Sequence, residues 1–110
     1  LIDRGVKAAV SSDAPYSPIS PWDVIKHSTE RLTKSGVVVG EVERISAATA
    51  LRSYLTPKND PAGEVRHIQV GSAADLCLLD QPLGEALKSP CAVSVVATII
   101  DGSPTHGLQP

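Results

Sequence analysis

One short segment of the sequence places a carboxylate directly after an apolar run. The residues Val-Lys-Ala-Ala-Val at 6–10 predict a short buried strand, and Ser11-Ser12-Asp13 follow at once, before Pro15. A parallel β/α unit presents catalytic side chains at the carboxyl end of its strand in this way, which makes Asp13 a candidate catalytic residue. Asp13 could equally serve as a structural residue of a turn before Pro15. The residues alone leave both interpretations open.

The elements that would position Asp13 lie directly after it. Residues 14–21 contain three prolines and predict a loop. Ser20 followed by Pro21 is typical of a helix start, with Ser as the N-cap and Pro as the first helical residue. The sequence therefore predicts a helix of about 14 residues that ends at Ser35-Gly36. Its core-facing positions recur at helical spacing and are Trp22, Ile25, Thr29 and Leu32.

The rest of the chain predicts one more helix and then strands. Ser46 is a second candidate N-cap, for a helix over 47–55 that Pro57 stops, and residues 57–63 read as an exposed loop. The apolar run within 75–80 predicts a strand buried on both faces, with Cys77 as a buried thiol. A β-branched strand is expected over 93–100, and the Asp101-Gly102 turn would fold 103–106 back as a hairpin. Residues 104–110 are rich in turn formers, and we expect a loose tail.

Composition excludes several classes of partner. The 110 residues carry 10 basic and 12 acidic side chains, a net charge of −2, so we expect no nucleic-acid partner. No apolar run approaches the roughly 20 residues needed to cross a bilayer, so we expect no membrane partner. Two cysteines make no disulfide framework, which favours a cytoplasmic location. The chain begins at Leu1 and contains no Met, which we interpret as a segment of a longer protein.

Four motifs in a fixed order resemble the C-terminal end of the amidohydrolase superfamily. The resemblance is to the branch of metal-dependent hydrolases that carries a Ser-Asp-Ala-Pro segment, and it covers residues 5–102. Three positions depart from the family pattern: Arg66 replaces a Gly, Ser72 replaces a Lys, and no apolar strand follows Gly102. The motifs are residues 5–15 with Pro21-Trp22, the Ser46 helix with Ala50-Leu51, Gly71-Ser72-Ala73-Ala74-Asp75-Leu76, and Ala97-Thr98-Ile99-Ile100-Asp101-Gly102.

The resemblance implies a fold and a chemistry. It implies that residues 1–62 are the last β/α unit of a (β/α)8 barrel with the helices that follow. Residues 63–110 would be the C-terminal strands of a small composite β-sandwich, and the chain by itself would be α+β. Asp13 would ligate a divalent metal, zinc being the expected ion, and would shuttle the proton of the attacking water. The reaction would be hydrolysis of a non-peptide C–N bond in a small-molecule substrate.

The chain by itself lacks most of that machinery. A catalytic zinc needs about three protein ligands, and the family's His-x-His and later histidine ligands have no counterpart here. His27, His67 and His106 match none of them and are expected to be exposed, while Arg31 is expected to form a surface ion pair. We therefore expect the 110 residues alone to be inactive and metal-free. Unpaired strand edges would make them a homo-oligomer. The alternative is a non-catalytic α+β module for binding or assembly.

Overall fold

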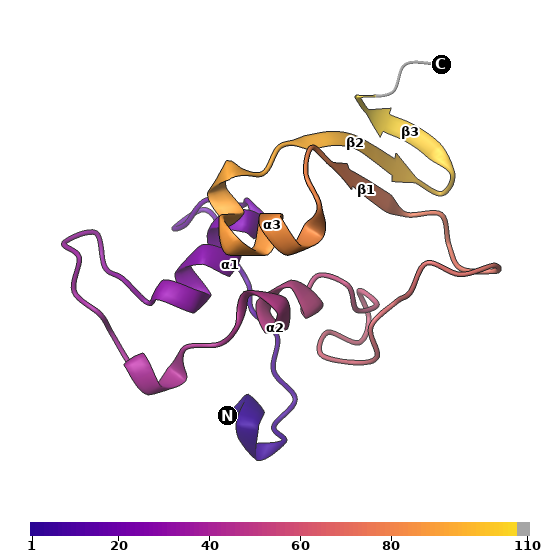
Figure 1. Cartoon of the computed structure of the whole chain (residues 1–110). Helices are drawn as coiled ribbons and strands as arrows, with labels where there is room; N and C mark the ends of the chain where they lie inside the picture. The colour runs from indigo at the N-terminus through magenta and orange to yellow at the C-terminus, as the bar shows by residue number, and fades with distance from the viewer. Residues whose placement is uncertain (108–110) are drawn as a thin grey trace. The chain divides into compact units, whose positions relative to one another are not determined.

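The computed structural model describes residues 1–107 and shows an α+β chain. These residues contain three α-helices, three short 3-10 helices and one three-stranded antiparallel sheet (Figure 1). They divide into two compact units, Leu1–Arg66 and the part that begins at His67. No helix within the described residues is long and apolar enough to span a membrane. The 3-10 helices are Ile2–Arg4, Glu41–Glu43 and Pro90–Ala92.

The first unit is built on two helices. Helix α1 (Pro21–Glu30) buries Val24 and Ile25, and α2 (Ala47–Arg52) packs against it and buries Ala50. The predicted start of α1 is confirmed. The helix ends earlier than expected, because Arg31 adopts a left-handed backbone conformation with φ 54°. An isolated bridge between Leu32 and Val38 then turns the chain back.

The two serines predicted to begin these helices differ in their contacts. Ser46 caps α2 as predicted, because its Oγ accepts a hydrogen bond from the backbone N–H of Thr49 at 3.1 Å. Ser20 precedes α1 but makes no side-chain capping bond. Helix α2 is also shorter than predicted, because turns replace the helix after Arg52. The loop over 57–63 is present as predicted.

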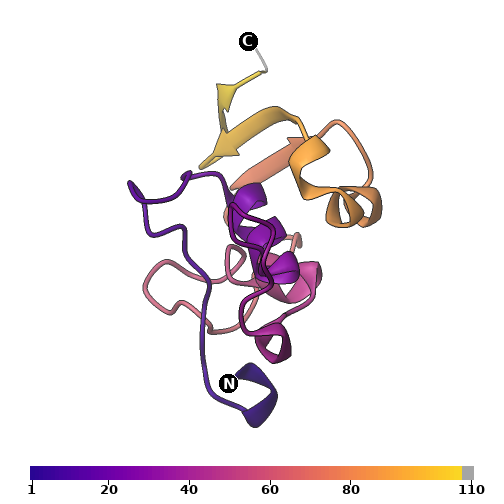
Figure 2. The ribbon, with the colours of Figure 1, turned by 90° about the vertical axis from the view of Figure 1, so that its left-hand side faces the viewer.

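The strand predicted over 6–10 is wrong in this structure. The segment is not a strand and runs as an open trace toward α1 (Figure 2). Residues 6–9 are exposed, and the N–H of Val10 donates to Ser53 Oγ at 3.2 Å. The physical reason is that a strand needs a neighbour to pair with, and no segment within the described residues pairs with this one. The described strands form no parallel pair, so the barrel stays a prediction from the resemblance.

The second unit is a three-stranded sheet with one helix. Strand β1 (Leu76–Leu79) pairs antiparallel with β2 (Val95–Ile100), which pairs with β3 (Ser103–His106). The two predicted strands and the hairpin are confirmed. Helix α3 (Leu83–Lys88) lies between β1 and β2 in the chain and was not predicted.

The turn of the hairpin is bonded to the residues before β1. Asp101 and Gly102 both have positive φ, 50° and 76°, as a two-residue type I′ turn requires. The N–H of Asp101 donates to Asp75 Oδ1 at 2.8 Å, and that of Gly102 donates to the carbonyl of Ala74 at 3.1 Å. Asp75 therefore has a structural role here.

Three predictions for this unit are wrong. Strand β1 is not buried on both faces, since Leu76 is 37% and Leu78 is 53% exposed. Cys77 is an exposed residue, and neither Cys77 nor Cys91 forms a disulfide within the described residues. The cause is that β2 is the one described element with which β1 makes extensive contact, so no helix covers its side chains. The expected loose tail is also wrong for 104–106, which belong to β3, whereas 108–110 lie outside the described residues.

Candidate functional site

Asp13 lies in a tight turn that its neighbours hold in place. The residue has φ 53°, a left-handed conformation that Asp tolerates better than most residues other than glycine. Its N–H donates to Ser11 Oγ at 3.4 Å, and the N–H of Ala14 donates to Ser12 Oγ at 3.3 Å. Its carbonyl accepts from the N–H of Tyr16 at 3.0 Å. The turn therefore fixes the backbone of Asp13, while the residue itself is exposed.

The residues around Asp13 do not make a metal centre by themselves. No group of three or more His, Cys, Asp or Glu side chains that could hold a metal occurs within residues 1–107. His27, His67 and His106 are all exposed. The donor set present is thus a single carboxylate, and it does not fit the three-ligand requirement of a catalytic zinc.

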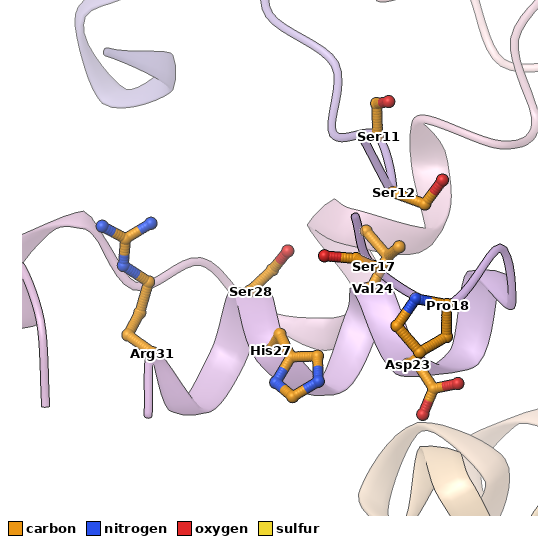
Figure 3. Close-up of a pocket in the computed structure, with 9 residues that line it drawn as sticks. All are labelled: Ser11, Ser12, Ser17, Pro18, Asp23, Val24, His27, Ser28 and Arg31. Atoms are coloured by element: carbon orange, nitrogen blue, oxygen red, sulfur yellow. The ribbon is translucent and has the colours of Figure 1, made fainter. Parts of the chain in front are cut away.

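Beside the Asp13 turn lies a pocket of about 210 Å³, which we call the serine pocket (Figure 3). The segment 11–18 forms one side and α1 the other. Asp23 and His27 are spaced four residues apart on α1 and so share one side of the helix, whereas Arg31 is the left-handed residue directly after it. Ser11 and Ser12 belong both to the pocket and to the Asp13 turn. The lining residues are Ser11, Ser12, Ser17, Pro18, Asp23, Val24, His27, Ser28 and Arg31.

The polar side chains of the serine pocket differ in whether they already form hydrogen bonds or ion pairs. Arg31 Nη2 pairs with Glu43 Oε2 at 3.2 Å, and Arg31 Nε donates to the carbonyl of Val39 at 2.9 Å. This confirms the surface ion pair predicted for Arg31. The side chains of Ser17 and Ser28 make no hydrogen bond within the described residues, and Figure 3 shows both on the pocket lining. Two hydroxyl groups are therefore available to a ligand.

A second pocket of about 210 Å³, which we call the valine pocket, shares His27 and Arg31 with the first. Its other lining residues are Leu32, Thr33 and Val39. The left-handed turn at Arg31 creates it, because the N–H of Val39 donates to the carbonyl of Arg31 at 2.8 Å and so returns the chain beside the helix end. The valine pocket thus contains two apolar side chains, Leu32 and Val39, whereas the serine pocket contains four serines.

Sequence reasoning singled out Asp13 as a candidate and predicted the ion pair of Arg31, but it predicted neither pocket. The four-residue spacing of Asp23 and His27 was a visible signal for one polar side of α1. The sequence did not indicate that Ser17 lines the serine pocket, because its position depends on how the proline-rich loop folds against α1.

Comparison with known proteins gives one informative match. The chain is 29% identical over 106 residues to the N-substituted formamide deformylase of Arthrobacter pascens. The match covers 93% of this chain and 20% of that protein, so the chain spans about a fifth of the length of this curated relative. No family model matches, and no solved structure matches. The similarity fits a hydrolase, and it does not extend to a particular branch of a superfamily.

Proposed function

We propose that this chain forms part of a metal-dependent hydrolase that cleaves a non-peptide C–N bond in a small substituted amide. The observation that carries the proposal is the match to the formamide deformylase along 93% of the chain. Removing a formyl group from a substituted nitrogen breaks a C–N bond, which is the bond class that the sequence motifs imply. The barrel and the composite sandwich belong to the same proposal.

Asp13 is the proposed catalytic carboxylate. It accepts the proton of the attacking water and returns it to the leaving nitrogen, a transfer suited to a carboxylate at an exposed, fixed position. The turn described above supports this role, because three hydrogen bonds hold the backbone while the carboxylate makes none within residues 1–107. Asp13 is also the one proposed metal ligand in this chain. The remaining ligands of a divalent ion such as zinc would come from sequence outside these 110 residues.

Replacing Asp13 by Asn in the full-length protein tests the proposal. The amide keeps the shape of the side chain but cannot accept the proton, so we expect formate release from N-alkylformamides to fall by about 10²-fold or more. Asp3→Asn is the matched control, because Asp3 is also an exposed carboxylate in this unit but lies on the first 3-10 helix. Near-normal turnover of Asp13→Asn would remove this residue from the mechanism.

The wild-type protein decides between an enzyme and the non-catalytic module. We expect the full-length protein to release formate when supplied with zinc, and the 110 residues alone to release none. If the full-length protein releases no formate from any N-alkylformamide, the binding or assembly module is the better description.

A further inference from the structure

We propose that the serine pocket and the valine pocket form one binding groove for an N-substituted amide, with the amide group in the serine pocket and the N-substituent in the valine pocket. The identity of this ligand rests on the proposed function. The groove itself rests on the geometry of the residues along α1 and the turn that follows it. Asp13 itself lines neither pocket, but Ser11 and Ser12 line the serine pocket and their hydroxyls hold the Asp13 turn, so an amide in this pocket would lie beside that turn.

The serine pocket has the donors and acceptors that an amide needs. An amide presents one carbonyl acceptor and, when it carries one substituent, one N–H donor. The hydroxyl groups of Ser17 and Ser28 can each donate or accept, and neither is engaged within the described part of the chain. Arg31 donates from Nε to the Val39 carbonyl and from Nη2 to Glu43, which, within the described part of the chain, leaves its Nη1 donors for a ligand.

The charge of the serine pocket favours a neutral ligand over an anion. Its lining contains one carboxylate, Asp23, and one guanidinium, Arg31, so the formal charges cancel when His27 is neutral. Arg31 is in addition paired with Glu43 at 3.2 Å, which reduces its attraction for a second anion. A carboxylate or phosphate ligand would therefore gain little electrostatic attraction here, whereas a neutral amide requires none.

The valine pocket supplies the apolar half of the groove. It shares His27 and Arg31 with the serine pocket, so the two pockets lie next to each other at the end of α1. Leu32 and Val39 provide the apolar surface. Val39 is held beside Arg31 by two hydrogen bonds, because its N–H donates to the Arg31 carbonyl at 2.8 Å and its carbonyl accepts from Arg31 Nε at 2.9 Å. Small-molecule sites commonly combine apolar walls with a few polar groups that fix orientation. The substituent on nitrogen, rather than the acyl side, would thus determine specificity.

Two variants of the full-length protein separate the halves of the groove. Ser28→Ala removes one hydroxyl that makes no bond within residues 1–107, and alanine is the best helix former. We expect it to raise KM for both N-methylformamide and N-hexylformamide by about 3- to 10-fold, the value of one hydrogen bond. Val39→Thr replaces a methyl by a hydroxyl at almost constant volume. We expect it to raise KM by about 4-fold for N-hexylformamide alone.

Controls and an independent binding measurement complete the test. Val37→Thr is the matched control for Val39→Thr, since the two valines are 58% and 51% exposed and Val37 lines neither pocket. Ser103→Ala, on β3, is the control for Ser28→Ala. Both controls should keep the wild-type KM, and kcat should stay within about 2-fold in all four variants, because a hydrogen bond or a methyl contact made equally in the ground and transition states changes KM alone.

The outcomes for the groove and for the proposed function are distinguishable. Calorimetry of N-hexylformamide binding that shows the same variant pattern, without formate release, supports the groove and contradicts the hydrolase. Formate release with the same KM in Ser28→Ala and Val39→Thr as in the wild type overturns the groove and leaves the hydrolase. Absence of binding, or an equal effect of Val37→Thr and Val39→Thr, also overturns the groove.

Discussion

Ser46 and Ser20 provide a matched pair for measuring how much one capping bond stabilises this chain. Both are the residue before an α-helix, but Ser46 Oγ accepts the N–H of Thr49 at 3.1 Å whereas Ser20 makes no side-chain capping bond. Ser46 Oγ also contacts Thr49 Oγ1 at 2.8 Å. Replacing an N-cap serine by alanine costs about 1 kcal/mol where the bond is present. We therefore expect Ser46→Ala to lower the free energy of unfolding by about 1 kcal/mol, and Ser20→Ala to change it by less than about 0.5 kcal/mol.

Urea unfolding followed by the fluorescence of Trp22 measures both variants. Trp22 is the one tryptophan in the sequence and lies in α1, which packs against α2, so its signal reports on the unit that contains both caps. The slope of the transition should stay constant, because neither change alters the surface exposed on unfolding. Equal losses of stability in the two variants would refute the reasoning, since they would show that the capping bond itself contributes nothing.

Three further predictions concern the core, the response to pH and association. Ile25 is fully buried, so Ile25→Ala should cost about 3 kcal/mol in urea unfolding, against almost nothing for Ile19→Ala, which is 81% exposed. Burial raises the pKa of the Tyr54 phenol, whose hydroxyl is buried without a hydrogen-bond partner. The unfolded chain therefore loses this proton first, and stability falls as pH rises above the ordinary value of about 10. Tyr54→Phe should lose less stability between pH 8 and pH 11, and an identical loss would contradict this account. The 110-residue chain should associate as a symmetric dimer through strand edges, and light scattering that shows a monomer across a dilution series would contradict it.

The open edge of β1 is the structural basis of the association prediction. Charged side chains commonly protect an edge strand, and Asp75 and Asp80 flank this one. Both are directed toward the β2 side, because Asp75 Oδ1 accepts from Asp101 and Asp80 Oδ1 accepts from the N–H of Ser94 at 3.0 Å. The opposite edge, β3, contains Pro104, which cannot donate to a ladder. β1 is therefore the edge more open to a second copy.

Local signals in the sequence predicted where elements begin better than where they end. Ser20-Pro21 and Ser46 mark helix starts through short-range chemistry, and Asp101-Gly102 marks a turn for the same reason. The end of α1 depends on Arg31, a residue type with no preference for the left-handed conformation it adopts. Helix α3 was missed because it follows Pro82 and has no capping side chain.

Features of the fold that depend on residues far apart in the sequence were harder to predict from it. The apolar run at 6–10 reads as a strand, but its state depends on a partner that the sequence pattern cannot supply. The turn at Asp13 was predictable as a candidate site because its chemistry lies in adjacent residues. The two pockets were not predictable from the sequence. The serine pocket requires the loop before α1 to pack beside this helix, and the valine pocket requires the turn after α1 to do the same.

The bonds at the tip of the β2–β3 hairpin change where this chain can be engineered. Hairpin tips are usually good places to insert a tag or a new terminus, because few hydrogen bonds connect them to the rest of the fold. Here the N–H groups of Asp101 and Gly102 are bonded to Asp75 and Ala74, some 26 residues earlier in the chain. An insertion at the tip would break both bonds and release the start of β1 together with the hairpin. The exposed turn at Lys58–Asp60, outside the sheet, is the better position for a fluorescent tag or a circular permutation.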